Sequence, residues 1–333
     1  MKAFVVGGAG FIGSHLVDQL IARGDSVTVF DNLSIGKRGF IGEHLDADRA
    51  TLIEADALDL GALSAMDGHD VVFHLSANPE ARWGLDNTRL DLEQGTIVTY
   101  NVLEAMRRAK VPKLVFASSG TVYGDTPRMC GEEDLGQLPI SLYGASKMAG
   151  EAMTSAFVEC FGLQAWIFRF GNVVGRRGTH GAALDFLRKL ELCETVLEVL
   201  GDGRQSKPYL HVSDCVAGIL HGLEHGHDKL NVLNLAPLDT TSVTRIAELC
   251  LAASPFPDAV IEYTGGDRGW PGDVPRSRMS PNRTSSLGFA VSRTSDEAVT
   301  LAVHELALEV FGERARPLVE ATAEATAERG VEG

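Results

Sequence analysis

The sequence predicts an α/β protein built on a doubly wound parallel sheet, with a smaller C-terminal α/β lobe. Two observations support this fold class. Short runs rich in β-branched residues alternate with helical patterns of apolar residues, and a glycine-rich turn follows the first run. A chain of 333 residues can also bury a substantial core, as one large domain or two smaller ones.

The alternation places the elements along the chain. The first strand, residues 3–6, is followed by a helical pattern over residues 15–22. Further strands are predicted over residues 26–30, 51–54, 70–75, 113–117 and 165–170. Further helices are predicted over residues 92–109, 143–161, 182–191, 213–225, 242–253 and 295–311.

The domain organisation follows from where this pattern changes. We expect the main domain over residues 1–172 and the smaller lobe mainly over residues 173–312, with later segments returning to the main domain. Gly, Pro and Arg gather in residues 265–286, as a substrate-binding lobe would show. Residues 313–333 are polar, rich in Ala and Glu and without an apolar stripe, which predicts a tail outside the folded core.

Charge and cysteine content narrow the function classes. The formal net charge of −15 argues against a nucleic-acid partner or an anionic membrane surface. Five widely spaced cysteines, without a C-x-x-C pair, predict free thiols in a reducing cytoplasm and no disulfide framework or metal site. No membrane span or leader segment is recognisable. We therefore expect a cytoplasmic protein that acts on small molecules.

The glycine-rich turn predicts a dinucleotide site. Gly7 permits a tight turn, Gly10 lets the backbone approach a pyrophosphate, and Gly13 lets the following helix pack on its strand. The N-terminus of that helix offers unpaired N–H donors to the anion. Asp31 ends the second strand, where its carboxylate can accept hydrogen bonds from ribose hydroxyls and would repel a 2′-phosphate. The turn therefore favours NAD over NADP.

A second group of residues predicts chemistry beside that site. Tyr143 and Lys147 are four residues apart, so on a helix their side chains share one face. A free tyrosine, with a pKa of about 10, is a poor base near neutral pH unless a cation stabilises its phenolate. Ser119 follows the strand at 113–117, at the sheet edge where ligands bind, so its hydroxyl can bond a reacting oxygen. A Tyr and a Lys at this spacing are common on solvated helices, but in this context the pair indicates catalysis.

The glycine spacing and Tyr143-x-x-x-Lys147 together resemble the extended short-chain dehydrogenase/reductase family, and within it the nucleotide-sugar epimerases. The resemblance runs from residue 2 to about residue 311. It includes the motifs at 31–34, 74–77, 118–124, 169–172 and 209–212. It implies that NAD is held by Gly7, Gly10, Phe11, Ile12, Gly13, Asp31, Asn32, Ser34, Gly36, Asp56, Ala57, Leu75, Ser76, Ala77, Tyr143 and Lys147.

The residues after Ser119 select the reaction within that family. Dehydrating members carry Asp and Glu there, and decarboxylating members generally keep the Glu, whereas this chain has Gly120 and Thr121. Neither side chain can act as a carboxylic acid, so the reaction should stop at reversible oxidation. The resemblance then implies 4-epimerisation. Tyr143 would remove the proton of the sugar 4-hydroxyl and a transient 4-keto sugar would form.

The resemblance also implies a set of substrate residues. They are Ser119, Tyr143, Asn172, His180, Lys207 and Arg268. Asn172 and Lys207 would meet the diphosphate. Arg268 lies two positions before the place where relatives often carry a phosphate-binding Arg, which is Trp270 here. His180 is expected either to approach the sugar or to cap the following helix.

Several alternatives remain open at this level. A UDP-linked sugar of the UDP-glucose/UDP-galactose kind is the family's usual substrate. UDP-glucuronate is the nearest alternative substrate because Arg82, Arg176 or Arg177 could pair with a 6-carboxylate. The chain could also be another nucleotide-sugar epimerase or a non-catalytic dinucleotide-binding sensor. Relatives pair through two helices per subunit, which implies a homodimer formed by residues 92–109 and 143–161. A family Asn that supports the cofactor is replaced by Gly95.

Overall fold

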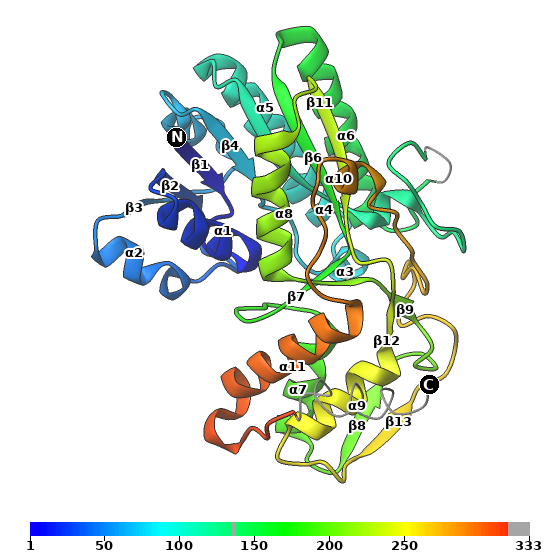
Figure 1. The fold of residues 1–333 in the computed structure, drawn as a ribbon. Coiled ribbons are helices and arrows are strands. Elements are labelled where there is room, and N and C mark those ends of the chain that lie inside the picture. The colour runs from blue at the N-terminus through cyan, green and yellow to red at the C-terminus, as the bar shows by residue number, and fades with distance from the viewer. Residues whose placement is uncertain (135–137, 319–333) are drawn as a thin grey trace, which may run out of the picture.

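Seven parallel strands form the central sheet of the computed structural model, which describes residues 1–134 and 138–318. Their order across the sheet is β3-β2-β1-β4-β5-β6-β11 (Figure 1). The strands are β1 (Lys2–Val6), β2 (Ser26–Asp31), β3 (Ala50–Glu54), β4 (Val71–His74), β5 (Lys113–Ser119), β6 (Gln164–Phe170) and β11 (Leu230–Leu235). The predicted parallel α/β sheet is confirmed, and β11 is a strand that the sequence pattern did not predict.

Helices cover both faces of this sheet (Figure 1). On one face, α1 (Phe11–Ala22) and α8 (Val212–His225) share a core with Ala3 and Val5 of β1. On the other, α5 (Val98–Ala109) and α6 (Leu142–Phe161) share a core with Phe4 and Val6. Successive strand residues point to opposite faces, so β1 is apolar on both faces from Ala3 to Val6. The strand order reverses between β1 and β4, and ligands bind at such a point beyond the carboxyl ends.

The helix predicted over residues 92–109 is interrupted. It consists of α4 (Arg89–Asp91), a π-helical segment η3 (Leu92–Ile97), and α5. A Cβ on Gly95, inside η3, would collide with the side chain of Ser146 on α6. Glycine therefore lets the two helices approach closely at the position where relatives carry Asn.

The other predicted helices are confirmed, and several short segments join them. The helices predicted over 143–161, 182–191, 213–225, 242–253 and 295–311 form with ends within one residue of the prediction. The other segments are η1 (Arg38–Phe40), α2 (Gly42–Asp46), η2 (Ala62–Met66), α3 (Trp83–Asp86), η4 (Gly120–Tyr123), α10 (Asn282–Ser286) and η5 (Gly312–Arg314).

The second lobe lies below the sheet in Figure 1. Helices α7 (Ala182–Leu192), α9 (Val243–Ala253) and α11 (Ser295–Phe311) enclose its core with the paired strands β8 (Val196–Val199) and β13 (Val260–Tyr263). Two further pairs join β7 (Asn172–Val174) to β10 (Tyr209–His211), and β9 (Ser206–Lys207) to β12 (Thr241–Ser242). Most of the tail predicted over 313–333, from residue 319 onward, lies outside the described residues.

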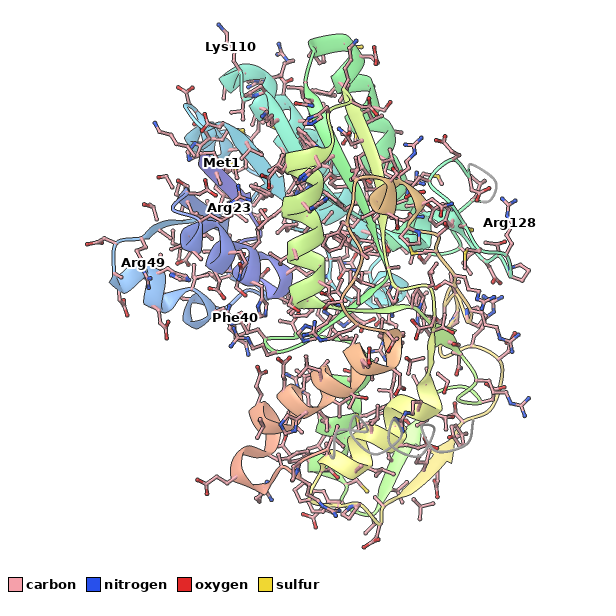
Figure 2. All side chains as sticks on the ribbon, in the orientation of Figure 1. Met1, Arg23, Phe40, Arg49, Lys110 and Arg128 are labelled. Carbon is pink, nitrogen blue, oxygen red and sulfur yellow. The ribbon has the colours of Figure 1, made fainter. Side chains whose placement is uncertain are left out.

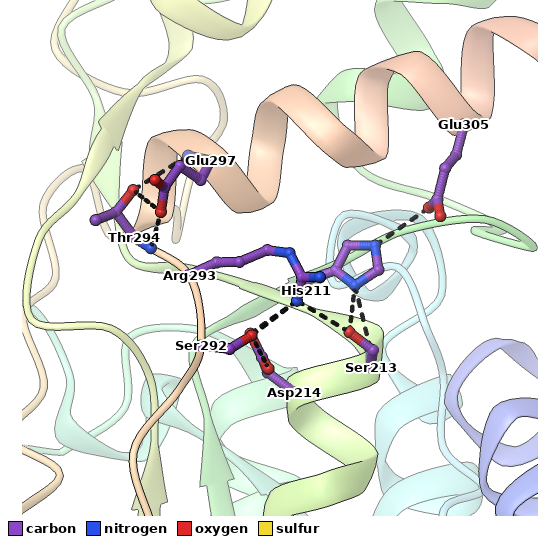
Figure 3. Close-up of polar contacts among 8 residues, drawn as sticks. All are labelled: His211, Ser213, Asp214, Ser292, Arg293, Thr294, Glu297 and Glu305. Atoms are coloured by element: carbon purple, nitrogen blue, oxygen red, sulfur yellow. Dashed lines mark hydrogen bonds and ion pairs between the residues drawn. The ribbon is translucent and has the colours of Figure 1, made fainter. Parts of the chain in front are cut away.

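Polar contacts fasten α11 to the strands that link the lobes (Figure 3). The helix begins at a capping box, in which the Thr294 hydroxyl accepts from the Glu297 N–H at 3.3 Å and the Glu297 carboxylate accepts from the Thr294 N–H at 2.8 Å. Further along α11, Glu305 lies 3.2 Å from Nε2 of His211 at the end of β10. His211 is therefore a structural residue between the lobes.

Neither the helices nor the labelled basic side chains indicate a membrane-spanning segment or a single basic patch in the part of the chain that the structure describes. Within residues 1–134 and 138–318, no helix is long and apolar enough to cross a membrane. The labelled basic side chains of Arg49, Lys110 and Arg128 lie at separate edges of the molecule, so these three do not form one basic patch (Figure 2).

Candidate active site

A cleft of about 520 Å³ lies at the carboxyl ends of the strands, between the two lobes. The first lobe contributes the turns that follow β1, β2, β4 and β5. The second contributes the start of α7 and the segments around residues 205–209 and 269–279. Every residue predicted to hold NAD lines this cleft: Gly7, Gly10, Phe11, Ile12, Gly13, Asp31, Asn32, Ser34, Gly36, Asp56, Ala57, Leu75, Ser76, Ala77, Tyr143 and Lys147.

The glycine turn has the shape that a pyrophosphate requires. Gly7 has a φ of +81°, which a residue with a side chain rarely adopts. A Cβ on Gly13 would overlap the carbonyl oxygen of Gly7, so only glycine lets α1 start this close to β1. Gly10 caps α1 without a side chain, and the first turn of this helix, Phe11 to Gly13, lines the cleft with N–H groups that have no partner within the helix. The turn therefore fits the pyrophosphate of NAD.

Asp31 is arranged to accept further hydrogen bonds. Its carboxylate accepts from the Ala9 N–H at 3.0 Å and from the Leu33 N–H at 2.9 Å. Burial raises the pKa of this carboxyl, while the two N–H donors oppose the shift. An ionised carboxylate has about four acceptor positions, so two remain for ribose hydroxyls. Beside it, Asn32 donates to Asp56 at 3.0 Å. These groups fit the adenosine ribose of NAD.

Tyr143 and Lys147 lie together at the start of α6. Ser141 caps this helix by accepting from the Gly144 N–H at 3.1 Å. Lys147 is 4% exposed, donates to the Ala117 carbonyl at 2.7 Å, and has its Nζ 5.7 Å from the centroid of the Tyr143 ring. Burial lowers the pKa of Lys147 to about 8 and raises the pKa of Tyr143 to about 12. The geometry brings the predicted base and its cation side by side.

Ser119 ends β5 beside Tyr143, and a hydrogen bond from its hydroxyl lowers the pKa of Tyr143 against the larger effect of burial. Its Oγ accepts from the N–H and the hydroxyl of Thr121, at 3.2 and 3.0 Å, so its own proton can be donated into the cleft. The next residue, Gly120, faces Met279, whose sulfur would lie 2.6 Å from a Cβ at that position. A side chain at residue 120 would therefore require the Met279 side chain to move. Sequence spacing gave no sign of Met279.

The predicted substrate residues divide into two groups. Ser119, Tyr143, Asn172, His180 and Lys207 line the cleft, whereas Arg268 does not. The Arg268 guanidinium donates instead to Asp125 at 2.6 Å and to the Asp273 carbonyl at 2.7 Å.

Two of these cleft residues have their own local contacts. The Lys207 ammonium is paired with the Asp273 carboxylate at 2.6 Å. His180 lies 3.2 Å from the Thr179 hydroxyl, and burial lowers its pKa. Trp270, at the position of the family Arg, lines the cleft.

Some features of the cleft were not predicted from the sequence. Arg82, named above as a possible partner of a 6-carboxylate, donates instead to Glu80 and to Asp185 of α7, each at 2.8 Å, and so connects the two lobes across the cleft. Gln205 is 2% exposed, and its amide oxygen has no hydrogen-bond partner among the described residues. These groups come from distant parts of the chain, so no local motif marks them.

Comparison with known proteins decides the family. A sequence model of the NAD dependent epimerase/dehydratase family matches residues 3–236. The chain belongs to this family. A putative UDP-glucose 4-epimerase of Methanocaldococcus jannaschii is 31% identical over 292 residues, which cover 86% of this chain and 92% of that protein.

Solved structures agree with this assignment to the epimerase/dehydratase family. A crystal structure of a UDP-galactose 4-epimerase matches with a TM-score of 0.83 and 37% identity, over 93% of this chain and all of that one. A UDP-glucuronic acid 4-epimerase from Bacillus cereus, in complex with UDP-glucuronic acid and NAD, matches with a TM-score of 0.81 and 25% identity, over 92% of this chain and 99% of that one. The chain is accordingly an NAD-dependent nucleotide-sugar epimerase.

Proposed function

We propose that this epimerase interconverts UDP-glucose and UDP-galactose through a transient 4-keto sugar. The observation that carries the proposal is the convergence of Tyr143, Lys147 and Ser119 at one end of the NAD cleft, without a carboxylic acid at residue 120 or 121. The names of similar proteins support a UDP-hexose substrate.

Each residue of the site has its own role in this reaction. The Tyr143 phenolate accepts the proton of the sugar 4-hydroxyl and returns it when the ketone is reduced. The Lys147 ammonium stabilises the phenolate and holds the nicotinamide ribose, while Ser119 donates to the reacting oxygen. NAD, when bound, supplies the acceptance and return of a hydride at C-4. Asn172 and Lys207 anchor the diphosphate while the sugar presents its other face.

A neutral hexose fits the cleft better than a hexuronate. Arg82 is the one predicted carboxylate partner that lines the cleft, and it is already paired with both Glu80 and Asp185. Arg176 and Arg177 lie outside the cleft lining, and Arg177 is paired with Asp18 at 2.8 Å. A 6-carboxylate beside Arg82 would therefore compete with two carboxylates that already pair with that cation.

We also propose that the enzyme is a homodimer formed through α5 and α6. Large apolar side chains are exposed beside these helices: Leu92 (49%), Tyr100 (46%) and Phe161 (52%). Contiguous exposed apolar side chains are typical of protein interfaces. Light scattering should give the mass of two chains at micromolar concentration, and the mass of one chain would contradict the proposal. Free thiols at all five cysteines support a cytoplasmic location. A role in carbohydrate metabolism rests on the proposed reaction of a nucleotide sugar.

Substrate conversion tests the reaction and the sugar together. The purified protein is incubated separately with UDP-glucose, UDP-galactose, UDP-N-acetylglucosamine and UDP-glucuronate, and each mixture is followed by proton NMR. We expect UDP-glucose and UDP-galactose to interconvert and UDP-glucuronate to remain unchanged. Conversion of UDP-glucuronate alone would overturn the hexose assignment, and loss of water or carbon dioxide would overturn the reaction.

A further inference from the structure

Lys147 is a buried cation that needs a counter-charge. Its ammonium has one hydrogen bond in the described structure, to the Ala117 carbonyl. Two carboxylates, Asp91 and Glu151, stabilise its charged form. Glu151 is already committed, because it accepts from the Arg169 guanidinium at 3.0 and 2.7 Å and from the Ser118 hydroxyl at 2.5 Å. Asp91 is therefore the carboxylate available to balance Lys147.

Asp91 is a buried carboxylate with half of its hydrogen-bonding capacity unused. It is 1% exposed at the end of α4. Its Oδ1 accepts from the Asn78 amide at 3.0 Å, whereas its Oδ2 has no hydrogen-bond partner among the described residues. An unpaired buried carboxylate oxygen is costly unless a nearby charge compensates it.

The fold holds this carboxylate against the start of α6. A Cβ on Gly84 of α3 would overlap Asp91 Oδ2 and would also lie 3.7 Å from Cβ of Leu142, the first residue of α6. Asp91 therefore lies beside the first turn of the helix that carries Tyr143 and Lys147. The N-terminus of a helix favours a negative charge. Gly95, four residues after Asp91, packs on Ser146 of the same helix α6.

We propose that Asp91 is a positioning residue that balances the charge of Lys147 and so sets the pH range over which the Tyr143–Lys147 pair works. The proposal rests on the catalytic roles assigned above to those two residues. The other titratable groups around Lys147 are His74 of β4 and Glu151 of α6. His74 is fully buried and neutral, with a pKa lowered to about 3, so it adds no charge near neutral pH.

The sign of the effect follows from the two interactions of Asp91. Its negative charge raises the pKa of Lys147, and it also raises the pKa of Tyr143. Removing that charge lowers both values. Tyrosinate then forms at lower pH, and Lys147 loses its proton at lower pH. Both limbs of the pH–rate profile should therefore move in the same direction, toward acid.

The experiment compares kcat against pH for the wild type, Asp91→Asn and Asp86→Asn. The last variant removes an equal charge from an exposed residue of the neighbouring helix α3. We expect both limbs of Asp91→Asn to shift toward acid by on the order of one pH unit, and those of Asp86→Asn to stay in place. The ultraviolet absorbance of tyrosinate, corrected with Tyr143→Phe backgrounds, should show the same shift without turnover.

Each outcome has a distinct meaning. If Asp91→Asn loses activity while both limbs stay where the wild type has them, Asp91 has a merely structural role and the proposal is wrong. Asp91→Ser also removes the charge, with a smaller side chain, and we expect it to show the same shifts. It takes the place of Asp91→Asn if that variant does not fold. A wild type without epimerase activity would instead overturn the proposed function, independently of Asp91.

Discussion

His74 should make the folded protein sensitive to acid, and the size of the effect can be worked out. The imidazole is fully buried beside Lys147, and burial, followed by the positive charge of Lys147, lowers its pKa from 6.5 to about 3. Between pH 6.5 and about pH 3, His74 is therefore protonated in the unfolded chain and neutral in the folded chain. Stability must fall as the pH drops through this window.

The hydrogen bonds of His74 show why the neutral ring is preferred. Thr99 donates its hydroxyl proton to the Gly95 carbonyl at 2.5 Å, so its oxygen accepts from Nε2–H of His74 at 2.9 Å. Nδ1 then faces the Ser76 hydroxyl at 3.4 Å as an acceptor. A second ring proton would require the Ser76 hydroxyl to turn from donor to acceptor, and it would place a buried positive charge near the Lys147 ammonium.

The linkage between protonation and folding gives the size of this loss of stability. With pKa values of 6.5 unfolded and about 3 folded, the free energy of unfolding at about pH 5 should be lower by about 2 kcal/mol than at about pH 7.5. Urea unfolding followed by circular dichroism at both pH values measures this loss. His74→Gln, which cannot titrate, should lose about 2 kcal/mol less than the wild type over the same interval. An equal loss in both proteins would refute the reasoning, because other groups would then account for the acid sensitivity.

Two further predictions follow from packing and charge. Gly13→Ala should weaken NAD binding, measured by calorimetry, by roughly tenfold or more, about 1.4 kcal/mol, whereas Gly42→Ala, which meets open space, should bind normally. Arg169→Met leaves the Glu151 carboxylate buried without its partner and should lower the free energy of unfolding by roughly 3–5 kcal/mol. Arg245→Met breaks an exposed ion pair and should cost about 1 kcal/mol or less, so equal losses would contradict the burial argument.

The sequence was most informative where a requirement is local. The glycine turn, the acid at the end of β2 and the Tyr-x-x-x-Lys spacing each involve residues within one turn or one element, and the structure places all of them on the cleft. The alternation of apolar runs with helical patterns likewise predicted six of the seven sheet strands. The seventh, β11, pairs with β6, and a long passage through the second lobe separates the two strands along the chain, so no motif of the Rossmann pattern lies next to β11 in the sequence.

Long-range packing explains what the sequence did not show. The approach of Met279 to Gly120, and of Asp185 to Arg82, depends on how the second lobe folds over the sheet. Within the π-helical segment Leu92–Ile97, Gly95 packs against Ser146, which is about fifty residues further along the chain. Ion pairs between distant parts of the chain are equally hard to predict. Arg268 was expected in the cleft, but its guanidinium pairs with Asp125, which is far away in the sequence.

The most direct test of the account is the turnover of Tyr143→Phe. This variant removes one hydroxyl from the proposed base, while Tyr263→Phe removes one from an exposed residue of β13. Both are assayed for interconversion of UDP-glucose and UDP-galactose, with bound NAD quantified in each. We predict that Tyr143→Phe keeps its NAD and loses activity by roughly 10²- to 10⁴-fold, while Tyr263→Phe matches the wild type. Near-normal turnover by Tyr143→Phe would contradict the central claim.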